Sequence, residues 1–138
     1  MNLTKDVKDI LTAAGVTEPV YRSYLPDGAD IPDDVVVLYE YAGLPSNSLD
    51  NRFFGYSLQV VTRSRSFDAG LERANSISDI LKDIGNSQIG REPVVVNHTL
   101  YFRFAALQTP FKLKEDEQRR IYFTQNFRVY ARTISKEE

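Results

Sequence analysis

The sequence contains no cysteine, no tryptophan and a single histidine among its 138 residues. The lack of cysteine excludes disulfides, thiolate metal sites and cysteine nucleophiles, and one imidazole excludes most histidine metal sites. The longest wholly apolar run is residues 35–39, far short of the roughly 20 residues that cross a bilayer. The opening residues 1–6 lack the apolar stretch of a signal peptide. We therefore expect a protein made in a cytoplasm that does not bind membranes.

An excess of basic residues is also missing. Seventeen Lys and Arg stand against nineteen Asp and Glu, which gives a net charge of −2 and a pI near 5.5. Proteins that bind nucleic acid by neutralising phosphates usually carry a basic surplus, so sequence-specific nucleic-acid binding is not expected. The 42% hydrophobic content of a 15.7 kDa chain supports one core. We expect a single domain over residues 1–138, with a frayed tail at 135–138.

Two segments have the periodicity of amphipathic helices, residues 3–14 and residues 67–84. Asn2 and Ser66 precede them and are suited to cap the exposed backbone N–H groups of a first turn. Gly85 follows the second segment and can adopt the left-handed conformation that ends a helix.

The remaining apolar segments alternate or are rich in β-branched and aromatic residues, which is typical of strands. The predicted strands are residues 19–24, 35–41, 54–64, 94–107 and 120–133. Polar loops are expected at 25–34, 43–52, 86–93 and 109–119. We therefore predict an α+β fold, with a mostly antiparallel sheet of about five strands and two main helices packed on it. The long last strand is expected to lie at an edge of this sheet and to be either protected or used for pairing.

Within the predicted strand 94–107, one face is expected to carry Leu100, Phe102, Phe104 and Ala106. Phe102 and Phe104 are expected to pack in the core. A base-stacking platform is the alternative, but the RNA-binding sheet motif needs a glycine that this segment lacks.

Residues that could support catalysis or metal binding are few. His98 is expected to be an ordinary structural or surface histidine, because a general base needs an acidic or hydroxyl partner in a concave site. The carboxylates Asp27, Asp30, Asp33 and Asp34 lack the spacing of a calcium loop, so a solvated turn is favoured over weak divalent binding. Neither a phosphate-binding glycine loop nor a Gly-x-Ser-x-Gly elbow is present. The sequence assigns no catalytic residue, metal ligand or cofactor, and we do not expect an enzyme.

Two other groups of residues could contact partners. Arg63 and Arg65, with Arg73 nearby, could form a small basic patch. The long loop at 43–54 carries apolar residues in a polar setting, which often marks a partner surface. Its candidate interface residues are Leu44, Pro45, Phe53 and Phe54. Alternatively, Phe53 and Phe54 simply begin the next strand and reach the core.

The C-terminal third carries a recognisable order of motifs. Residues 108–110 read Gln-Thr-Pro, residues 111–119 are highly charged, and residues 126–129 read Asn-Phe-Arg-Val. This order resembles the closing hairpin of the phage minor capsid and tail terminator proteins, the head–tail joining family of long-tailed bacteriophages.

Earlier landmarks of that family follow in the expected order along nearly the whole chain. They are the Leu-Pro-Asp turn at 25–27, the aliphatic strand before Gly-Leu-Pro at 43–45, and Gln-Val-Val-Thr-Arg at 59–63. The chain departs from the family at residues 112–115, where many relatives carry glycine and arginine, and at Pro45-Ser46, where relatives have a double proline.

The resemblance implies a structural virion protein located at the top of the tail and assembled in the host cytoplasm. Its expected role is a tail terminator, a ring of typically six copies that caps the tail tube, stops its polymerisation and joins tail to head. The implied partners are further copies of the chain, the tail tube protein and the head-completion or connector protein, with phage DNA passing through the ring. The alternatives are a head-side neck or minor capsid component, and a monomeric module that binds peptides at an open sheet edge.

The charged loop offers both signs of charge for such contacts, which set register more than affinity. The candidate interface residues in it are Lys112, Lys114, Glu115, Asp116, Glu117 and Arg119. A solvated charged hairpin without a partner is the alternative interpretation.

Overall fold

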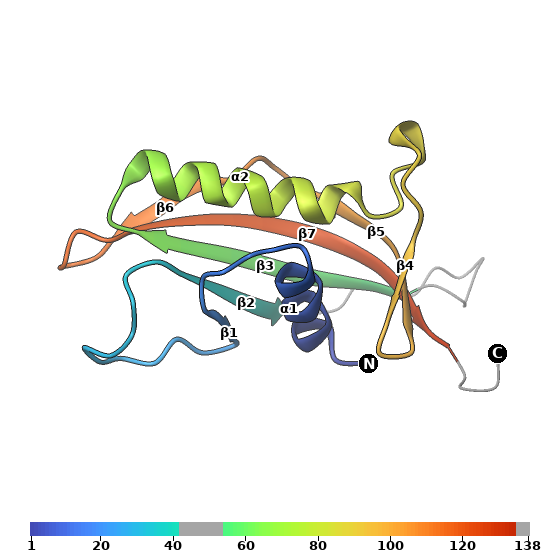
Figure 1. Cartoon of the computed structure of the whole chain (residues 1–138), viewed down its shortest axis with the longest axis horizontal. Helices are drawn as coiled ribbons and strands as arrows, with labels where there is room; N and C mark the ends of the chain where they lie inside the picture. Colours follow the sequence, from blue (N-terminus) through green and yellow to red (C-terminus); the bar gives the residue numbers. More distant parts are fainter. Residues whose placement is uncertain (42–53, 135–138) are drawn as a thin grey trace.

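A computed structural model of the chain describes residues 1–41 and 54–134. It has an α+β fold in which two helices lie against one seven-stranded sheet (Figure 1). The elements in chain order are α1 (Leu3–Ala13), β1 (Val20–Arg22), β2 (Val35–Tyr41), β3 (Phe54–Ser64), α2 (Phe67–Asp83), η1 (Ser87–Ile89), β4 (Val94–Val96), β5 (Thr99–Ala106), β6 (Phe111–Glu115) and β7 (Ile121–Thr133).

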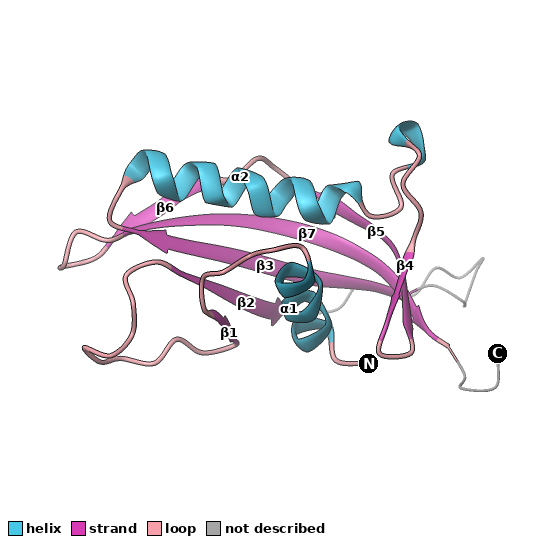
Figure 2. Ribbon diagram, in the orientation of Figure 1, coloured by secondary structure: helices cyan, strands magenta, loops and turns pink. Residues whose placement is uncertain are grey.

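The sheet order is β1-β2-β3-β7-β5-β4, and β6 pairs with β7 beside β5. All strand pairs are antiparallel except β1 with β2. The predicted α+β class with a mostly antiparallel sheet is therefore confirmed (Figure 2).

Both predicted helix starts are confirmed. The Asn2 side chain accepts a hydrogen bond from the Lys5 N–H, and the Ser66 hydroxyl accepts one from the Ala69 N–H. After α2, Gly85 has φ of +68° and turns the chain away from the helix. Neither helix in the described ranges has the length and apolar composition of a membrane span.

Both helices pack on the same face of the sheet and enclose the main core. Helix α1 contributes Leu3, Val7 and Leu11, and α2 contributes Ile77 and Leu81. The opposite face holds a smaller cluster at one end, where Leu25 and Ile31 pack on the buried side chains Val35, Val37 and Val61. The N-terminal half of β2 is thus covered on both faces, as its continuous apolar run predicts.

The last strand is not at an edge, which corrects the sequence prediction. Strand β7 pairs with β3 along residues 54–64, and its other side pairs with β5 and β6. β5 and β6 follow one another along β7 and are separated by residues 107–110. In the part of the chain that the structure describes, β6 has no strand on its outer side.

The predicted single strand at 94–107 is two strands, because Asn97 and His98 form a tight turn with φ of 48° and 64°. Two positive φ values are typical of the two-residue turns that join twisted hairpins. A register shift between Tyr101 and Arg103 then changes which side chains face the helices. Tyr101 and Phe104 are buried and stack 5.6 Å apart, so the predicted shared face of Leu100, Phe102, Phe104 and Ala106 is wrong.

The predicted loop at 109–119 is also wrong in part, since residues 111–115 form β6. All five of its side chains are exposed, so no buried face produces a periodic apolar pattern in the sequence. Adding β4 and β6 raises the strand number from about five to seven.

Candidate functional site

The turn between β6 and β7 is built around the carboxylate of Asp116. This carboxylate accepts hydrogen bonds from the backbone N–H groups of Gln118 and Arg120, both at 3.0 Å. It also accepts one from Arg120 Nε at 2.8 Å and one from the Tyr122 hydroxyl at 3.0 Å. Asp116 therefore organises the hairpin from within, and its charge is already paired inside the chain.

The protonation of Asp116 follows from these contacts. Desolvation by itself would raise the pKa of the carboxyl. The hydrogen bonds from Arg120 and Tyr122 and the Arg120 charge outweigh it and lower the pKa to about 2. The side chain is thus ionised at any physiological pH.

Ion pairs and hydrogen bonds connect the hairpin and strand β3 to the 25–34 loop. Asp33 lies 2.6 Å from Arg65 Nε and 3.8 Å from Arg120 Nη1. The buried Arg63 donates from Nε to the Asp33 carbonyl at 3.0 Å and from Nη2 to the Pro32 carbonyl at 2.7 Å. Between the loop and these arginines lies a cleft of about 740 Å³. These contacts link the 25–34 loop to β3 and to the β6–β7 hairpin at this end of the sheet.

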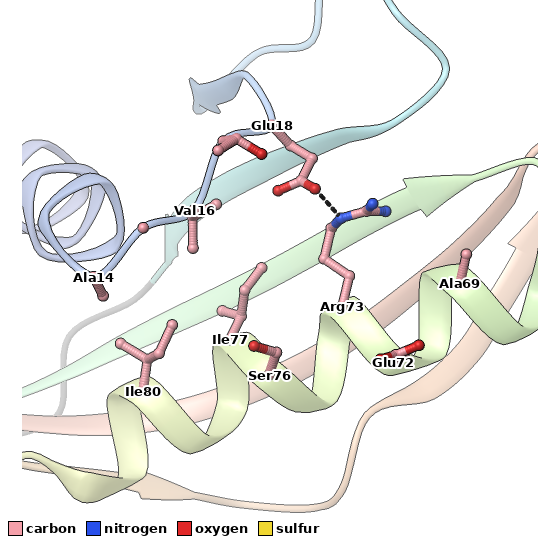
Figure 3. A pocket seen from close by; sticks show the side chains of 11 residues that line it. Ala14, Val16, Glu18, Ala69, Glu72, Arg73, Ser76, Ile77 and Ile80 are labelled. Atoms are coloured by element: carbon pink, nitrogen blue, oxygen red, sulfur yellow. Dashed lines mark ion pairs between the residues drawn. The ribbon is translucent and has the colours of Figure 1, made fainter.

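These contacts correct the expected basic patch. Arg63 and Arg65 are engaged by the 25–34 loop, and Arg73 lies 2.6 Å from Glu18 across the groove between α2 and the segment after α1 (Figure 3). That groove has a volume of about 410 Å³ and is lined mainly by small and aliphatic side chains beside this ion pair. Arg63 is therefore bonded to backbone carbonyls, whereas Arg65 and Arg73 are each paired with a carboxylate, so the three side chains are engaged within the chain and do not form a free basic patch.

The other candidate residues of the hairpin differ in whether their charged side chains have a partner within the chain. Lys112 lies 3.6 Å from Glu115, and the Lys114 ammonium lies 4.7 Å from the centre of the Tyr122 ring. Glu117 and Arg119 are exposed at the tip, and within residues 1–41 and 54–134 their side chains have no ion pair. The tip therefore presents one free charge of each sign to the solvent.

Arg119 also has an unusual backbone. Its φ of 63° lies in the left-handed region, where a glycine is favoured in three-residue hairpin loops. An arginine there costs about 1 kcal/mol in conformational energy.

The Gln-Thr-Pro motif marks the break between β5 and β6. The Gln108 side-chain oxygen accepts from the Asn126 N–H at 3.0 Å, and its carbonyl accepts from Gln125 Nε2 at 2.7 Å. Side chains thus replace the ladder hydrogen bonds where the strand is interrupted.

The remaining sequence candidates are less informative. Leu44, Pro45 and Phe53 lie outside the described residues, and Phe54 opens β3 opposite Ala131. His98 is exposed in the β4–β5 turn. Asp33 is in an ion pair, whereas Asp27 and Asp30 are exposed. No group of His, Asp and Glu in the described ranges is placed to hold a metal ion.

Arg120, one of the charged residues of the predicted loop region around 109–119, and Tyr122, which the sequence did not single out, both hold Asp116. A signal was present, because an aspartate at the start of a short polar turn commonly accepts hydrogen bonds from the backbone that follows. The contact of Asp33 with Arg65 and Arg120 gave no signal, because Asp33 is far from both in sequence.

Comparison with known proteins shows where this architecture recurs. A family model described as "Bacteriophage tail terminator protein" matches residues 4–132. A chain from the solved structure "Virion of native gene transfer agent (GTA) particle" shares the fold with a TM-score of 0.64 and 16% sequence identity. The alignment covers 94% of each chain. No curated protein matches the chain in sequence. Because the family model spans nearly all of the sequence, this chain belongs to the bacteriophage tail terminator family and is a structural tail protein.

Proposed function

We propose that the chain is a tail terminator that assembles into a ring, the closed hexamer implied by its family resemblance, caps the tail tube, and connects the tail to the head. The observation that carries this proposal is the family match over residues 4–132. The proposed partners are other copies of the chain, the tail tube protein and a head-completion protein, at the head–tail junction of the virion.

The β6–β7 hairpin is the part of this structure best suited to contact a neighbour. Asp116 and Asp33 hold it through hydrogen bonds and ion pairs, and among the described residues β6 presents an unpaired strand edge with exposed Phe111 and Leu113. Open edges with exposed apolar side chains are avoided in proteins unless they are covered or used for pairing. We assign interface roles in this hairpin to Lys112, Lys114, Glu115, Glu117 and Arg119, with Asp116 holding their frame. We also propose contacts with a neighbouring subunit or the tube for the candidate residues of the 43–54 loop, which are Leu44, Pro45, Phe53 and Phe54.

The test is tube capping in vitro. Tail tube protein is polymerised with and without the purified chain, and tube lengths and tube ends are examined by negative-stain electron microscopy. We expect shorter tubes of uniform length with a ring at one end. Tubes of unchanged length without rings contradict the proposal.

A variant of Arg119 separates folding from assembly. Arg119→Gly removes the exposed charge and also the left-handed strain, so the unfolding free energy should rise slightly, by less than about 1 kcal/mol. Capping should nevertheless weaken if Arg119 contacts a neighbour. Ser23→Gly is the matched control, because Ser23 also has φ of 63° and is exposed, but lies beside β1. Equal capping by both variants contradicts a contact at Arg119.

A further inference from the structure

Among the residues that the structure describes, the charged side chains on the strand face opposite the helices are all basic. Phe127, Val129 and Ala131 of β7 are buried against the helices, so the alternate residues of this strand face the other side. Those residues include Arg128 and Arg132.

The neighbouring strand adds a third arginine to the same place. Arg103 of β5 pairs with Tyr130 of β7, and paired residues of an antiparallel ladder lie on the same face. Arg128 and Arg132 are the residues next along this face on either side of Tyr130. Arg103, Arg128 and Arg132 are called the arginine face below.

The arginine face lacks a counter-charge in the part of the chain that the structure describes. Glu40 and Glu115 pair with Leu58 and Ile121, which places both glutamates on the helix side of the sheet. None of the three arginines has an ion pair among the described residues, and the Nε atom of Arg132 is buried without a hydrogen-bond partner. Buried polar groups are usually hydrogen-bonded, so this guanidinium N–H still lacks the acceptor that burial normally requires among residues 1–41 and 54–134.

Unpaired carboxylates are found at the other end of the molecule. Asp27 and Asp30 of the 25–34 loop are exposed and have no ion pair in the described ranges, whereas Asp33 is held by Arg65. The loop between β1 and β2 extends to one end of the long axis, and the C-terminal end of β7 lies at the opposite end (Figure 1). The two charged surfaces therefore cannot meet within one chain.

We infer that the arginine face of one copy binds Asp27 and Asp30 of a second copy. A contact between two different surfaces at opposite ends of a subunit is heterologous, and it produces a ring when the rotation between copies closes. The inference rests on the proposed function, since it names the contact that would close the terminator ring. A protein carboxylate fits better than a DNA phosphate, because the chain as a whole has a net charge of −2.

Cysteine cross-linking tests the contact directly, because the chain has no cysteine of its own. The double variant Asp30→Cys/Arg128→Cys is oxidised with oxidised glutathione and analysed on non-reducing gels. We expect a ladder of covalent oligomers that ends at one closed species. The control is Asp79→Cys/Arg128→Cys, since Asp79 is equally a surface aspartate but lies on α2. A ladder no stronger than the control overturns the inference.

Charge reversal gives an independent test by sedimentation velocity. We expect self-association to weaken at least tenfold in each of two double variants, Asp27→Lys/Asp30→Lys and Arg103→Glu/Arg128→Glu. The chain that carries all four changes should recover self-association. The control Asp68→Lys/Asp79→Lys makes the same charge change on α2 and should leave association unchanged. Failure of the combined variant to recover, while its circular dichroism stays native, overturns the inference.

Two further outcomes distinguish this inference from the proposed function. Rings that cap tubes without the Asp30–Arg128 cross-link overturn the inference and leave the function standing. Cross-linked rings that do not cap tubes support the inference and contradict the proposed tail-terminator function. Binding of a DNA duplex that is lost in Arg103→Glu/Arg128→Glu, with self-association unchanged, would assign the arginine face to nucleic acid instead.

Discussion

At the scale of single residues, Asp116 links the chemistry of the β6–β7 turn to its stability. The carboxylate accepts two backbone and two side-chain hydrogen bonds, and its pKa is lowered to about 2 from an ordinary value of 3.8. A carboxyl whose folded pKa lies below its unfolded pKa stabilises the fold above the unfolded value. That stabilisation is lost as the pH falls from about 4 towards 2.

We therefore predict that Asp116→Asn lowers the unfolding free energy at pH 7 by about 1–3 kcal/mol, because an amide nitrogen would face donors in Arg120 and Tyr122. The difference from the unmodified chain should shrink as the pH falls from 4 to 2. Urea unfolding at pH 7, 4 and 2 measures this. Glu117→Gln is the control, since Glu117 is an exposed neighbour without an ion pair in the described ranges, and a similar loss there would contradict the assignment.

Gly85 is a second residue whose identity is required by its surroundings. A Cβ atom at this position would overlap the carbonyl oxygen of Phe102, and the φ of +68° also disfavours a side chain. Gly85→Ala should therefore destabilise the fold by about 2 kcal/mol or more. Gly90→Ala should cost only about 1 kcal/mol, because Gly90 has a similar φ of +72° and open space around it. Thermal unfolding of the two variants should separate them, and equal losses would rule out the steric explanation.

At the scale of elements, helix α1 is held to the sheet by buried polar contacts as well as by its apolar stripe. The Tyr101 hydroxyl donates a hydrogen bond to the buried Asp6 carboxylate, and Asn97 Nδ2 donates to the other carboxylate oxygen at 2.8 Å. Burial, together with the Asp6 contact, raises the pKa of Tyr101 well above its usual range. The hydroxyl therefore stays a donor at every working pH.

We predict that Tyr101→Phe lowers the unfolding free energy by about 1–3 kcal/mol, because a buried carboxylate oxygen loses its donor. Amide hydrogen exchange should become faster in α1 more than in α2, since the lost contact docks α1. Tyr24→Phe removes an exposed hydroxyl and serves as the control. Uniform acceleration across both helices would contradict a specific role in docking α1.

The elements differ in how well the sequence predicts them, for physical reasons. β2 and β3 were predicted with their observed bounds and α2 to within one residue, because each has a long apolar pattern matched to its period. β6 was missed because its exposed side chains show no such pattern, and β4 was missed because its turn consists of Asn97 and His98 without a glycine. The shift at Tyr101 depends on pairing with β7, which no local pattern encodes.

At the scale of the whole molecule, the hairpin tip offers a way to change assembly without changing folding. Exposed charges without close partners contribute little to stability. Glu117→Lys/Arg119→Glu should therefore leave the unfolding free energy within about 0.5 kcal/mol while reducing tube capping. The comparison is calorimetry against the capping assay, with Lys8→Glu on α1 as a control away from the hairpin. Normal capping by the double variant would exclude the tip from the interface.

The sequence by itself determined the two helices, the long strands, the α+β class and the family resemblance, because these depend on periodicity, caps and motifs read along the chain. Tertiary structure decided that β7 is central and that the Asp116 carboxylate is hydrogen-bonded within its own hairpin. It likewise decided that Arg63 and Arg65 contact the 25–34 loop and that Arg73 pairs with Glu18. It also decided that Arg103 joins Arg128 and Arg132 on one face. These outcomes depend on strand register and on contacts between residues far apart in sequence, where a shift of one position exchanges the two faces of a strand.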